Sequence, residues 1–283
     1  MKQKVLKVAL IGKTNSGKST LLNKIIGETI SIINKKVNTT QEIIIGIFND
    51  RDTQIVFYDT PGLNFIKTID KVQKKLKSEL WQGIDESDII LFLLDSSKIN
   101  LVRLEEQLIR LNKLDKKILF VFNKIDLIKK NILLSLVSDL NKKFKIESFF
   151  YISARYGLGV KDLIDYIKKL SKVKKWLFPV DQISNKNNIF ITNECTRNAV
   201  LTFLHKEIPY NIKVYNQYYK FLKNGDLKIK QKLKIDNLRY KKIVLGKKGE
   251  KIKKIREFSQ IQISKIFDCK THLYIELIVN NAK

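Results

Sequence analysis

The stretch VALIGKTNSGKST, residues 8–20, places a glycine-rich loop directly after a run of apolar residues. From Gly12 to Ser19 it follows the pattern G-x-x-x-x-G-K-[ST], which forms a phosphate-binding loop where a strand meets a helix. The backbone N–H groups of such a loop curl around phosphate, and the N-terminus of the following helix adds a favourable dipole. We expect Lys18 to reach the β- and γ-phosphates and the Ser19 hydroxyl to bind Mg²⁺. The stretch predicts a nucleotide site but not its base.

The first 170 residues alternate between short apolar runs and longer stretches of helical periodicity, which predicts βαβ units and a mostly parallel sheet. The run 42–49 and the strand after it are close enough to form a hairpin, so one edge strand is expected to be antiparallel. The predicted fold class is α/β, with a P-loop G domain over residues 1–170. Strands are predicted at 4–12, 42–49, 53–59, 88–95, 117–123 and 148–153, and helices at 18–27, 68–83, 100–113, 129–143 and 160–170.

Further motifs stand where predicted strands end, which is the edge at which open α/β sheets bind ligands. DTPG (59–62) follows the third strand. Asp59 can hold the Mg²⁺ shell through water, and the Gly62 N–H can sense a γ-phosphate. By itself such a segment is also an ordinary proline turn. Its place at the end of a predicted strand therefore supports a nucleotide site more than its sequence does.

The base is indicated by NKID (123–126) and SAR (153–155), which end the fifth and sixth predicted strands. The Asp126 carboxylate can accept hydrogen bonds from guanine N1–H and N2–H₂, a pairing that adenine does not offer. Asn123 can brace the loop and reach N7, while the stem of Lys124 can lie along the base. The backbone N–H groups of the SAR segment suit guanine O6. Together the motifs predict GTP rather than ATP.

This set of motifs resembles that of the translation-factor-related G proteins, which implies a threonine that closes over Mg²⁺ and the γ-phosphate. VNTTQ (37–41) lies where that threonine belongs, and we favour Thr40 over Thr39. Leu63 stands where many small G proteins have a glutamine that orients the attacking water, so intrinsic hydrolysis is expected to be slow. Asn15 resembles an asparagine that holds K⁺ in some relatives, and it could equally brace the loop.

The predicted site therefore has catalytic and metal-binding members within a larger nucleotide-binding set. Lys18, Thr40 and Gly62 are the predicted catalytic residues, and Ser19 and Thr40 are the predicted Mg²⁺ ligands. The predicted GTP-binding residues are Gly12, Asn15, Ser16, Gly17, Lys18, Ser19, Thr20, Asp59, Gly62, Asn123, Lys124, Asp126, Ser153, Ala154 and Arg155.

The pattern changes after residue 170, which predicts a linker over 171–190 and a smaller α+β domain over 191–283. In that domain we expect a helix at 194–207, strands at 211–222, 227–235 and 272–279, and a helix at 250–267. Residues 1–170 hold 30 basic and 19 acidic residues, and residues 171–283 hold 25 and 9. A polyanionic partner is one explanation of this excess. A lysine-rich genome bias that leaves a solvated surface is the other.

The segment KIVLGKKGEKIKKI (242–255) places GxxG between a short apolar turn and an amphipathic helix. A GxxG loop clamps a nucleic-acid backbone, because glycines allow close approach and flanking lysines neutralise phosphate. Ile243, Leu245, Ile252 and Ile255 are expected to form an apolar floor for the bases, although such a loop can also be a plain helix–helix turn. The predicted RNA-binding residues of this type II KH domain are Lys242, Gly246, Lys247, Lys248, Gly249 and Lys253.

Other features exclude several classes of protein. Cys195 and Cys269 are the only cysteines, and the two histidines have no ligand-like spacing. A disulfide framework and a structural zinc site are therefore not expected. The apolar runs fall far short of the ~20 residues that a membrane span needs, and the first residues do not form a signal peptide.

A G domain followed by a GxxG domain resembles the Era family of ribosome-assembly GTPases across nearly the whole chain. Beyond the G motifs, the resemblance is carried by ISIINKKVNTTQEIIIGI (30–47), HKEIPYNIKV (205–214), KKIVLGKKGEKIKKI (241–255) and HLYIELIV (272–279). It implies GTP-controlled binding to the 3′ end of 16S small-subunit ribosomal RNA and a role in maturing the 30S subunit. It also implies a cytoplasmic monomer, with peripheral contact at the inner face of the cell membrane in some members.

The chain departs from the family pattern at a few places. Gln41 replaces the arginine usual after the switch threonines, and Arg256, Ser259 and Gln260 replace a glycine and an Ala-Arg pair. The fine RNA specificity of the helix is therefore less transferable than the GxxG clamp. Two alternatives stay open at this point, a GTPase of tRNA modification and a constitutive RNA-binding scaffold with a structural nucleotide domain.

Overall fold

The structure is a computed structural model that divides into two compact units. The described residues up to Asn185 form the first unit, and those from Lys186 form the second. The residues described are 2–31, 43–62, 71–99, 104, 115–129, 131–132, 135, 138, 140–141, 148–205 and 207–279.

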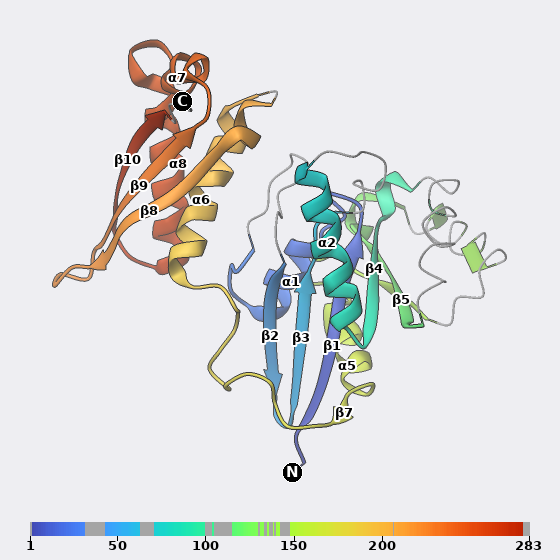
Figure 1. Cartoon of the computed structure of the whole chain (residues 1–283). Helices are drawn as coiled ribbons and strands as arrows, with labels where there is room; N and C mark the ends of the chain where they lie inside the picture. Colours follow the sequence, from blue (N-terminus) through green and yellow to red (C-terminus); the bar gives the residue numbers. More distant parts are fainter. Residues whose placement is uncertain are drawn as a thin grey trace. The chain divides into compact units, whose positions relative to one another are not determined.

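The first unit is built on a mostly parallel sheet in the order β2-β3-β1-β4-β5-β6 (Figure 1). Only β2 runs antiparallel to its neighbour within this order, and it lies at the edge, so the predicted hairpin is confirmed. The helices expected at 100–113 and 129–143 fall largely outside the described residues. The strands are β1 Lys4–Gly12, β2 Ile44–Asp50, β3 Thr53–Asp59, β4 Ile89–Asp95, β5 Lys117–Asn123 and β6 Phe149–Tyr151, and the helices are α1 Lys18–Ile26, α2 Lys71–Glu86 and α5 Val160–Lys168, with short 3₁₀ turns η2 Ser96–Lys98 and η3 Ile125–Leu127.

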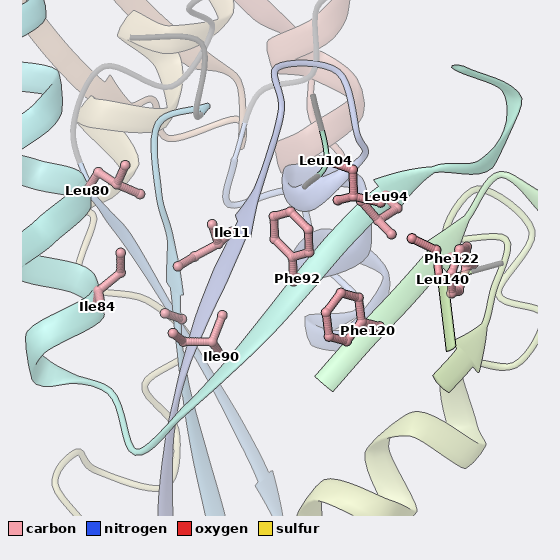
Figure 2. Packing of buried hydrophobic residues seen from close by; sticks show 11 residues of the cluster. Ile11, Leu80, Ile84, Ile90, Phe92, Leu94, Leu104, Phe120, Phe122 and Leu140 are labelled. Carbon is pink, nitrogen blue, oxygen red and sulfur yellow. The ribbon is translucent and has the colours of Figure 1, made fainter. Parts of the chain in front are cut away.

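The strands of this sheet are continuous apolar runs because both of their faces are covered. Phe92 of β4 and Phe120 of β5 meet edge to face with ring centroids 5.7 Å apart, and Leu80 and Ile84 of α2 pack into the same cluster (Figure 2). Each such side chain contributes roughly 1.5–3 kcal/mol when it is fully buried. This core fixes the carboxyl ends of the strands, where the functional motifs begin.

Residues 171–185, which lie in the stretch predicted as a linker, cross from β1 past β3 to the edge strand β2 of the sheet in the first unit (Figure 1). We call this segment the strap. Its start, β7 (Lys172–Val173), pairs with β1, and Ile183 O accepts a 2.9 Å hydrogen bond from Ile47 N of β2. The buried Gln54 side chain donates to Phe178 O and accepts from Leu177 N and Phe178 N. The domain boundaries predicted at 170 and 190 stay predictions.

The second unit packs helices on one face of a three-stranded sheet in the order β10-β9-β8 (Figure 1). Strand β10 is parallel to β9, and β8 is antiparallel to it. This arrangement is the smaller α+β KH fold expected from the sequence. Its elements are α6 Asn188–Phe203, η4 Ile208–Asn211, β8 Ile212–Phe221, β9 Leu227–Ile235, α7 Leu238–Leu245, η5 Lys247–Gly249, α8 Glu250–Phe267 and β10 Thr271–Val279.

Two helices of this unit differ from the sequence expectation. The first begins at Asn188 rather than 194, because the Asn187 side chain caps it by accepting from Phe190 N, and it ends at Phe203 with Leu204 extended. The stretch before the GxxG loop is the helix α7 rather than a short apolar turn. The Asn237 side chain caps it by accepting from Arg239 N. Asparagine caps of this kind fix a helix start that apolar periodicity alone does not locate.

None of the helices in the described residues is long and apolar enough to span a bilayer.

Candidate functional site: a guanine-nucleotide pocket and a GxxG loop

The phosphate loop joins β1 to α1, as the sequence predicted. Gly17 has φ 98°, and a Cβ there would stand 2.1 Å from Asn123 Nδ2, so only glycine fits without displacing that side chain. Gly62 packs against the same loop, since a Cβ on it would stand 2.6 Å from Thr14 Oγ1. The DTPG turn and the phosphate loop are therefore in direct contact at this edge of the sheet.

The Lys18 ammonium lies over the phosphate loop and donates to Gly12 O at 3.1 Å and to Lys13 O at 3.3 Å. The side chain is 6% exposed. Burial lowers the pKa of Lys18, and the charge of Asp59 only partly opposes this. Burial likewise raises the pKa of Asp59, against the opposing effects of Lys18 and of the Ser19 and Ser31 hydroxyls. Burial thus disfavours the charged form of each group, and an anion bound near Lys18 together with a cation bound near Asp59 would oppose that effect.

The residues present fit a Mg²⁺ ion bound with nucleotide. Ser19 Oγ donates to Asp59 Oδ2 at 2.6 Å, and Ser31 Oγ donates to the same oxygen at 2.9 Å. The other carboxylate oxygen, Asp59 Oδ1, is buried and has no hydrogen-bond partner among the described residues, and the same holds for Ser16 Oγ in the loop. A hydroxyl and a carboxylate are ligands that Mg²⁺ prefers, directly or through water. Thr40 and Thr39 lie outside the described residues, and so does Leu63.

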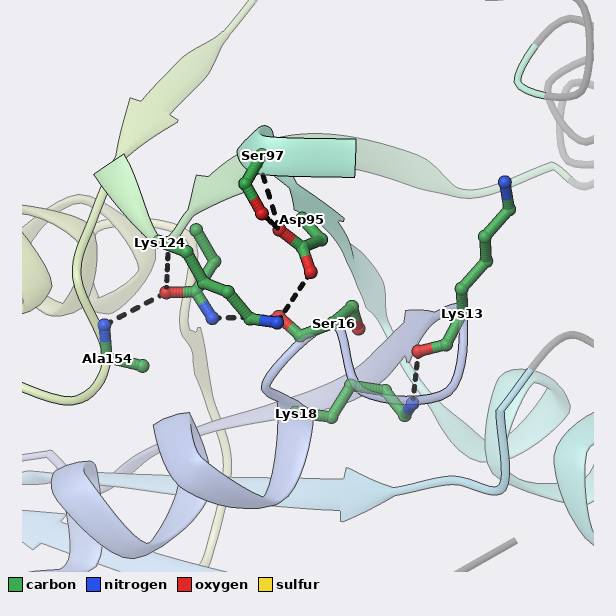
Figure 3. A network of polar contacts seen from close by, with 8 residues as sticks. Lys13, Ser16, Lys18, Asp95, Ser97, Lys124 and Ala154 are labelled. Atoms are coloured by element: carbon green, nitrogen blue, oxygen red, sulfur yellow. Dashed lines mark hydrogen bonds and ion pairs between the residues drawn. The ribbon is translucent and has the colours of Figure 1, made fainter. Parts of the chain in front are cut away.

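Asn123 connects the phosphate loop with the two loops of the predicted base site, and Figure 3 shows its partners Ser16, Lys124 and Ala154. Its Nδ2 donates to Ser16 O at 2.8 Å in the phosphate loop. Its Oδ1 accepts from Lys124 N at 2.8 Å and from Ala154 N at 2.9 Å in the SAR loop. One side chain therefore sets the distance between the phosphate site and the base site. The exposed Asp126 follows within η3, where its carboxylate is accessible to a base.

A residue that the sequence analysis missed completes this network. Asp95, the last residue of β4, accepts from Lys124 Nζ at 2.5 Å and from Ser97 Oγ at 2.6 Å. Burial acts to raise the pKa of Asp95, but the hydrogen bonds from Lys124 and Ser97 hold it below the usual range. The ion pair anchors the Lys124 stem, whose backbone has φ 64°. The sequence held a signal for this residue, because Asp95 ends a predicted buried strand at the same sheet edge as the other motifs.

The remaining predicted nucleotide residues also lie at this edge. Thr20 is in the first turn of α1, and Asn15 adopts φ 65° within the loop. Ser153 N donates to Leu158 O at 3.0 Å, which closes the SAR turn, and Ser153 Oγ is buried with no partner in the described chain. The exposed Arg155 lies over the ring of Tyr156 with 5.5 Å between guanidinium carbon and ring centroid.

The GxxG loop of the second unit is an open turn between α7 and α8. Gly246 has φ 72°, and a Cβ there would stand 2.7 Å from Lys251 Cβ, whereas a Cβ on Gly249 would meet nothing within 4 Å. Lys247 and Lys248 project from the turn and are exposed. Lys242 of α7 and Lys253 of α8 are exposed on either side of it.

One part of the expected apolar floor is wrong. Ile255 is fully buried in the core cluster formed with Val244 and Leu233, so it does not face a ligand. Ile243 is 42% exposed, and Leu245 and Ile252 are half-buried. The helical period placed Ile255 on the inner side of α8, one turn past the loop.

Comparison with known proteins agrees with this architecture. Residues 7–124 match the family described as 50S ribosome-binding GTPase, and residues 207–283 match the KH domain family. The chain is 36% identical over 286 residues to GTPase Era of Rickettsia conorii, covering 99% of this chain and 84% of that protein. It is 38% identical over 280 residues to GTPase Era of Rickettsia prowazekii, covering 96% and 92%.

The chain belongs to the Era family of GTPases.

Solved structures of the Era family have the same fold. A crystal structure of Era in complex with MgGDPNP and nucleotides 1506–1542 of 16S ribosomal RNA matches with a TM-score of 0.86 at 30% identity, over 99% of this chain and 95% of that one. An Aquifex aeolicus Era variant bound to GDP·AlF₄⁻ matches with a TM-score of 0.87 at 29% identity, over the same shares. The prediction of an Era-type G domain followed by a KH domain is therefore confirmed.

Proposed function

We propose that the chain is a GTP-hydrolysing switch that binds the 3′ end of 16S small-subunit ribosomal RNA through its KH domain and assists maturation of the 30S subunit. The observation that carries this proposal is Asn123, which ties the phosphate loop to the SAR loop beside an accessible Asp126. The same chain carries the open GxxG loop with its exposed lysines. The related Era bound to MgGDPNP and 16S RNA supports both halves.

In this proposal the first unit binds the nucleotide with the residues described at the sheet edge. The backbone N–H groups of the loop from Asn15 to Thr20 surround the phosphates, and Lys18 turns from the loop carbonyls to the β- and γ-phosphates. Asp126 accepts from the guanine edge, and the Lys124 stem, anchored by Asp95, covers the base. Ser19 and Thr40 hold Mg²⁺ with Asp59 behind them, and the ion neutralises charge between the phosphates.

Hydrolysis is proposed to be slow in the absence of an activator. Leu63 follows the DTPG turn, and a leucine can neither orient a water by hydrogen bonding nor act as a base. The Gly62 N–H would then contact the γ-phosphate, but the neighbouring side chain would not be polar and could not align the attacking water. Asn15, at φ 65° in the loop, is the residue proposed to hold K⁺, whose charge would assist in the place of an arginine.

The second unit is proposed to clamp a single RNA strand at the GxxG loop. Gly246 and Gly249 let the RNA backbone approach, and Lys247 and Lys248 neutralise its phosphates. Lys242 and Lys253 extend the same charge along α7 and α8. The chain is proposed to act as a monomer in the cytoplasm, with peripheral contact at the inner face of the cell membrane.

The switch is tested by the affinity of the full chain for a 16S 3′-end RNA in saturating GDP and in a non-hydrolysable GTP analogue. Coupling of about 1–3 kcal/mol is expected, which is about 5–150-fold in affinity. The Lys18→Ala variant is the control, since it should lose the dependence on nucleotide. Equal affinities in both nucleotides would contradict the switch and favour a constitutive scaffold.

A further inference from the structure

The sheet of the second unit has a face that the helices do not cover. Along β9 the residues alternate, with Leu227, Ile229 and Leu233 buried against α6 and α8 and the lysines between them on the opposite side. Since side chains in a strand point alternately to the two faces, one half of β9 packs the core and the other half faces away from it. We call this opposite side the outer sheet face.

The strand register gathers lysines on the outer sheet face. Lys213 and Lys220 of β8 stand opposite Lys234 and Lys228 of β9. Neighbouring lysines on β9 are two residues apart, which is roughly 6.8 Å along a strand. Among the residues that the register places on this face, Glu276 carries a carboxylate, 3.7 Å from Lys232 Nζ, and His272 lies 2.7 Å from the carboxylate of Asp226. The six lysines are Lys213, Lys220, Lys228, Lys230, Lys232 and Lys234.

Three tyrosines lie among these lysines. Tyr218 of β8 and Tyr274 of β10 both stand opposite Lys230, so the central lysine has an aromatic ring on each side. Tyr215 stands opposite Lys232. The three side chains are 38%, 53% and 47% exposed in that order. Lys228 Nζ lies 5.9 Å from the Tyr274 ring centroid, which keeps a cation over that ring.

A β-bulge brings two of the tyrosines to the same face. Tyr215 and Tyr218 are three residues apart, so in a regular strand their side chains would point to opposite faces. The register shifts between Asn216 and Tyr218, which adds one residue to β8 and returns Tyr218 to the outer side. Tyr219 is thereby turned inward against Phe267. Bulges re-aim side chains in this way, and they are frequent on edge strands such as β8 and beside functional sites.

The combination of rings and cations indicates the chemistry of the partner. Lysines alone suit a solvated surface and single exposed rings are ordinary, but a solvated surface does not require three rings interleaved with six lysines on one face. Aromatic rings on a sheet face that is also basic are the arrangement on which single-stranded bases stack while lysines neutralise the backbone. A duplex would offer phosphates to the lysines but would keep its bases stacked away from the rings.

We propose that the outer sheet face binds a second stretch of single-stranded RNA, with Tyr215, Tyr218 and Tyr274 stacking on bases and the β9 lysines contacting phosphates. The proposal rests on RNA as the partner in the proposed function. It requires neither the GxxG clamp nor the nucleotide switch. A long single strand would then engage both surfaces of the second unit, and its affinity would exceed that of a strand that reaches only one.

The test uses the full chain carrying Lys247→Asp and Lys248→Asp, which disable the GxxG clamp. Fluorescence anisotropy would measure its affinity for a labelled uridine 20-mer at low salt. Adding Tyr218→Ala and Tyr274→Ala should weaken this binding by about tenfold or more, since stacking is worth about 1–3 kcal/mol per base. The matched control is Tyr210→Ala, an exposed tyrosine of the same unit outside the sheet, which should change the affinity less than about twofold.

A second variant guards against loss of fold. Lys230→Gln keeps the strand and removes one cation, so the slope of log affinity against log salt should decrease by about 0.7. The matched control Lys223→Gln, in the turn after β8, should leave the slope unchanged. Thermal unfolding of each variant confirms that the second unit is intact.

Three results would overturn the proposal. The first is an affinity unchanged by the tyrosine substitutions in a folded variant. The second is equal, tyrosine-independent binding of a duplex of the same length. The third is loss of binding to anionic phosphatidylglycerol vesicles, but not to RNA, in the same variants, which would assign the face to a membrane surface. Failure of the proposed function is distinguishable, because it would appear as no preference for 16S 3′-end RNA over a scrambled sequence.

Discussion

The phosphate loop of the first unit and the GxxG loop of the second both use glycines before a helix, yet their surroundings differ. Gly17 is packed against Asn123, and Lys18 is buried over loop carbonyls. Gly249 has open space beside it, and the lysines of its loop are exposed. A loop that is packed on all sides can bind only a ligand of one shape. An open loop can bind any segment of a polymer that carries the right charge. The difference predicts that substitutions at the phosphate loop reduce nucleotide affinity strongly, whereas substitutions at the GxxG loop reduce RNA affinity weakly.

The largest effect is expected at the base end of the closed site. Asp126→Asn should weaken GTP binding by about a thousandfold, because two hydrogen bonds to a charged group are worth about 3–6 kcal/mol together. Binding of XTP should increase in the same variant, since xanthine offers a carbonyl where guanine has its amino group. Nucleotide titration calorimetry would measure both, with Asp162→Asn as the exposed control. If GTP affinity were unchanged, Asp126 would not contact the base.

The glycines allow a direct comparison of the two loops. Gly17→Ala should reduce affinity for GDP and GTP by about a hundredfold, because the methyl group displaces Asn123 from both loops that it joins. Gly249→Ala meets no atom and bears only the strain of φ 79°, about 1–2 kcal/mol. It should lower the melting temperature of the second unit by several degrees and leave nucleotide affinity unaltered. Equal effects on nucleotide binding would remove the contrast between the loops.

At the open loop we expect a graded electrostatic effect. Lys247→Gln with Lys248→Gln should weaken binding of the 16S 3′-end RNA by about tenfold at low salt. The slope of log affinity against log salt should decrease by about 1.4, because two phosphate contacts are lost. The effect should be the same for RNAs of different sequence, because these lysines meet phosphates. RNA titrations at several salt concentrations would measure it. A sequence-dependent loss would instead mean that the lysines read bases.

The smallest effect is expected at Asp95, which positions Lys124 without touching the ligand. Asp95→Asn should weaken GDP binding by about fivefold, since the Lys124 stem loses its anchor in a partly buried pair. Nucleotide-free stability should change little. The control Asp115→Asn removes an exposed carboxylate two residues before β5, at the opposite end of that strand from the site. A change in melting temperature without a change in GDP affinity would assign Asp95 to folding alone.

The strand ends were predictable because buried parallel strands are continuous apolar runs, and the four G motifs follow them directly. Asp95 also follows a buried strand directly but belongs to no familiar motif. Its role depends on the direction of the Lys124 side chain, which the sequence does not predict. The bulge in β8 was not predictable, since YNQYY reads as an unbroken strand. Helix α7 was missed because its start depends on the Asn237 cap in a stretch of only eight helical residues.

The strap has a consequence for where the first unit can be cut. A fragment ending at Leu170 would leave Oε1 of the buried Gln54 side chain without its two backbone donors, while the Asp52 carbonyl would lose the Trp176 indole but keep its hydrogen bond from Lys4 N. An unsatisfied buried polar group such as Gln54 Oε1 costs about 1–3 kcal/mol. A fragment ending at Asn185 keeps these partners, together with the pairing of the Asn185 side chain to Ile45 N. The last residues of the strap therefore cover the edge strand β2, and a fragment that lacks them would leave that edge open to pairing with another chain.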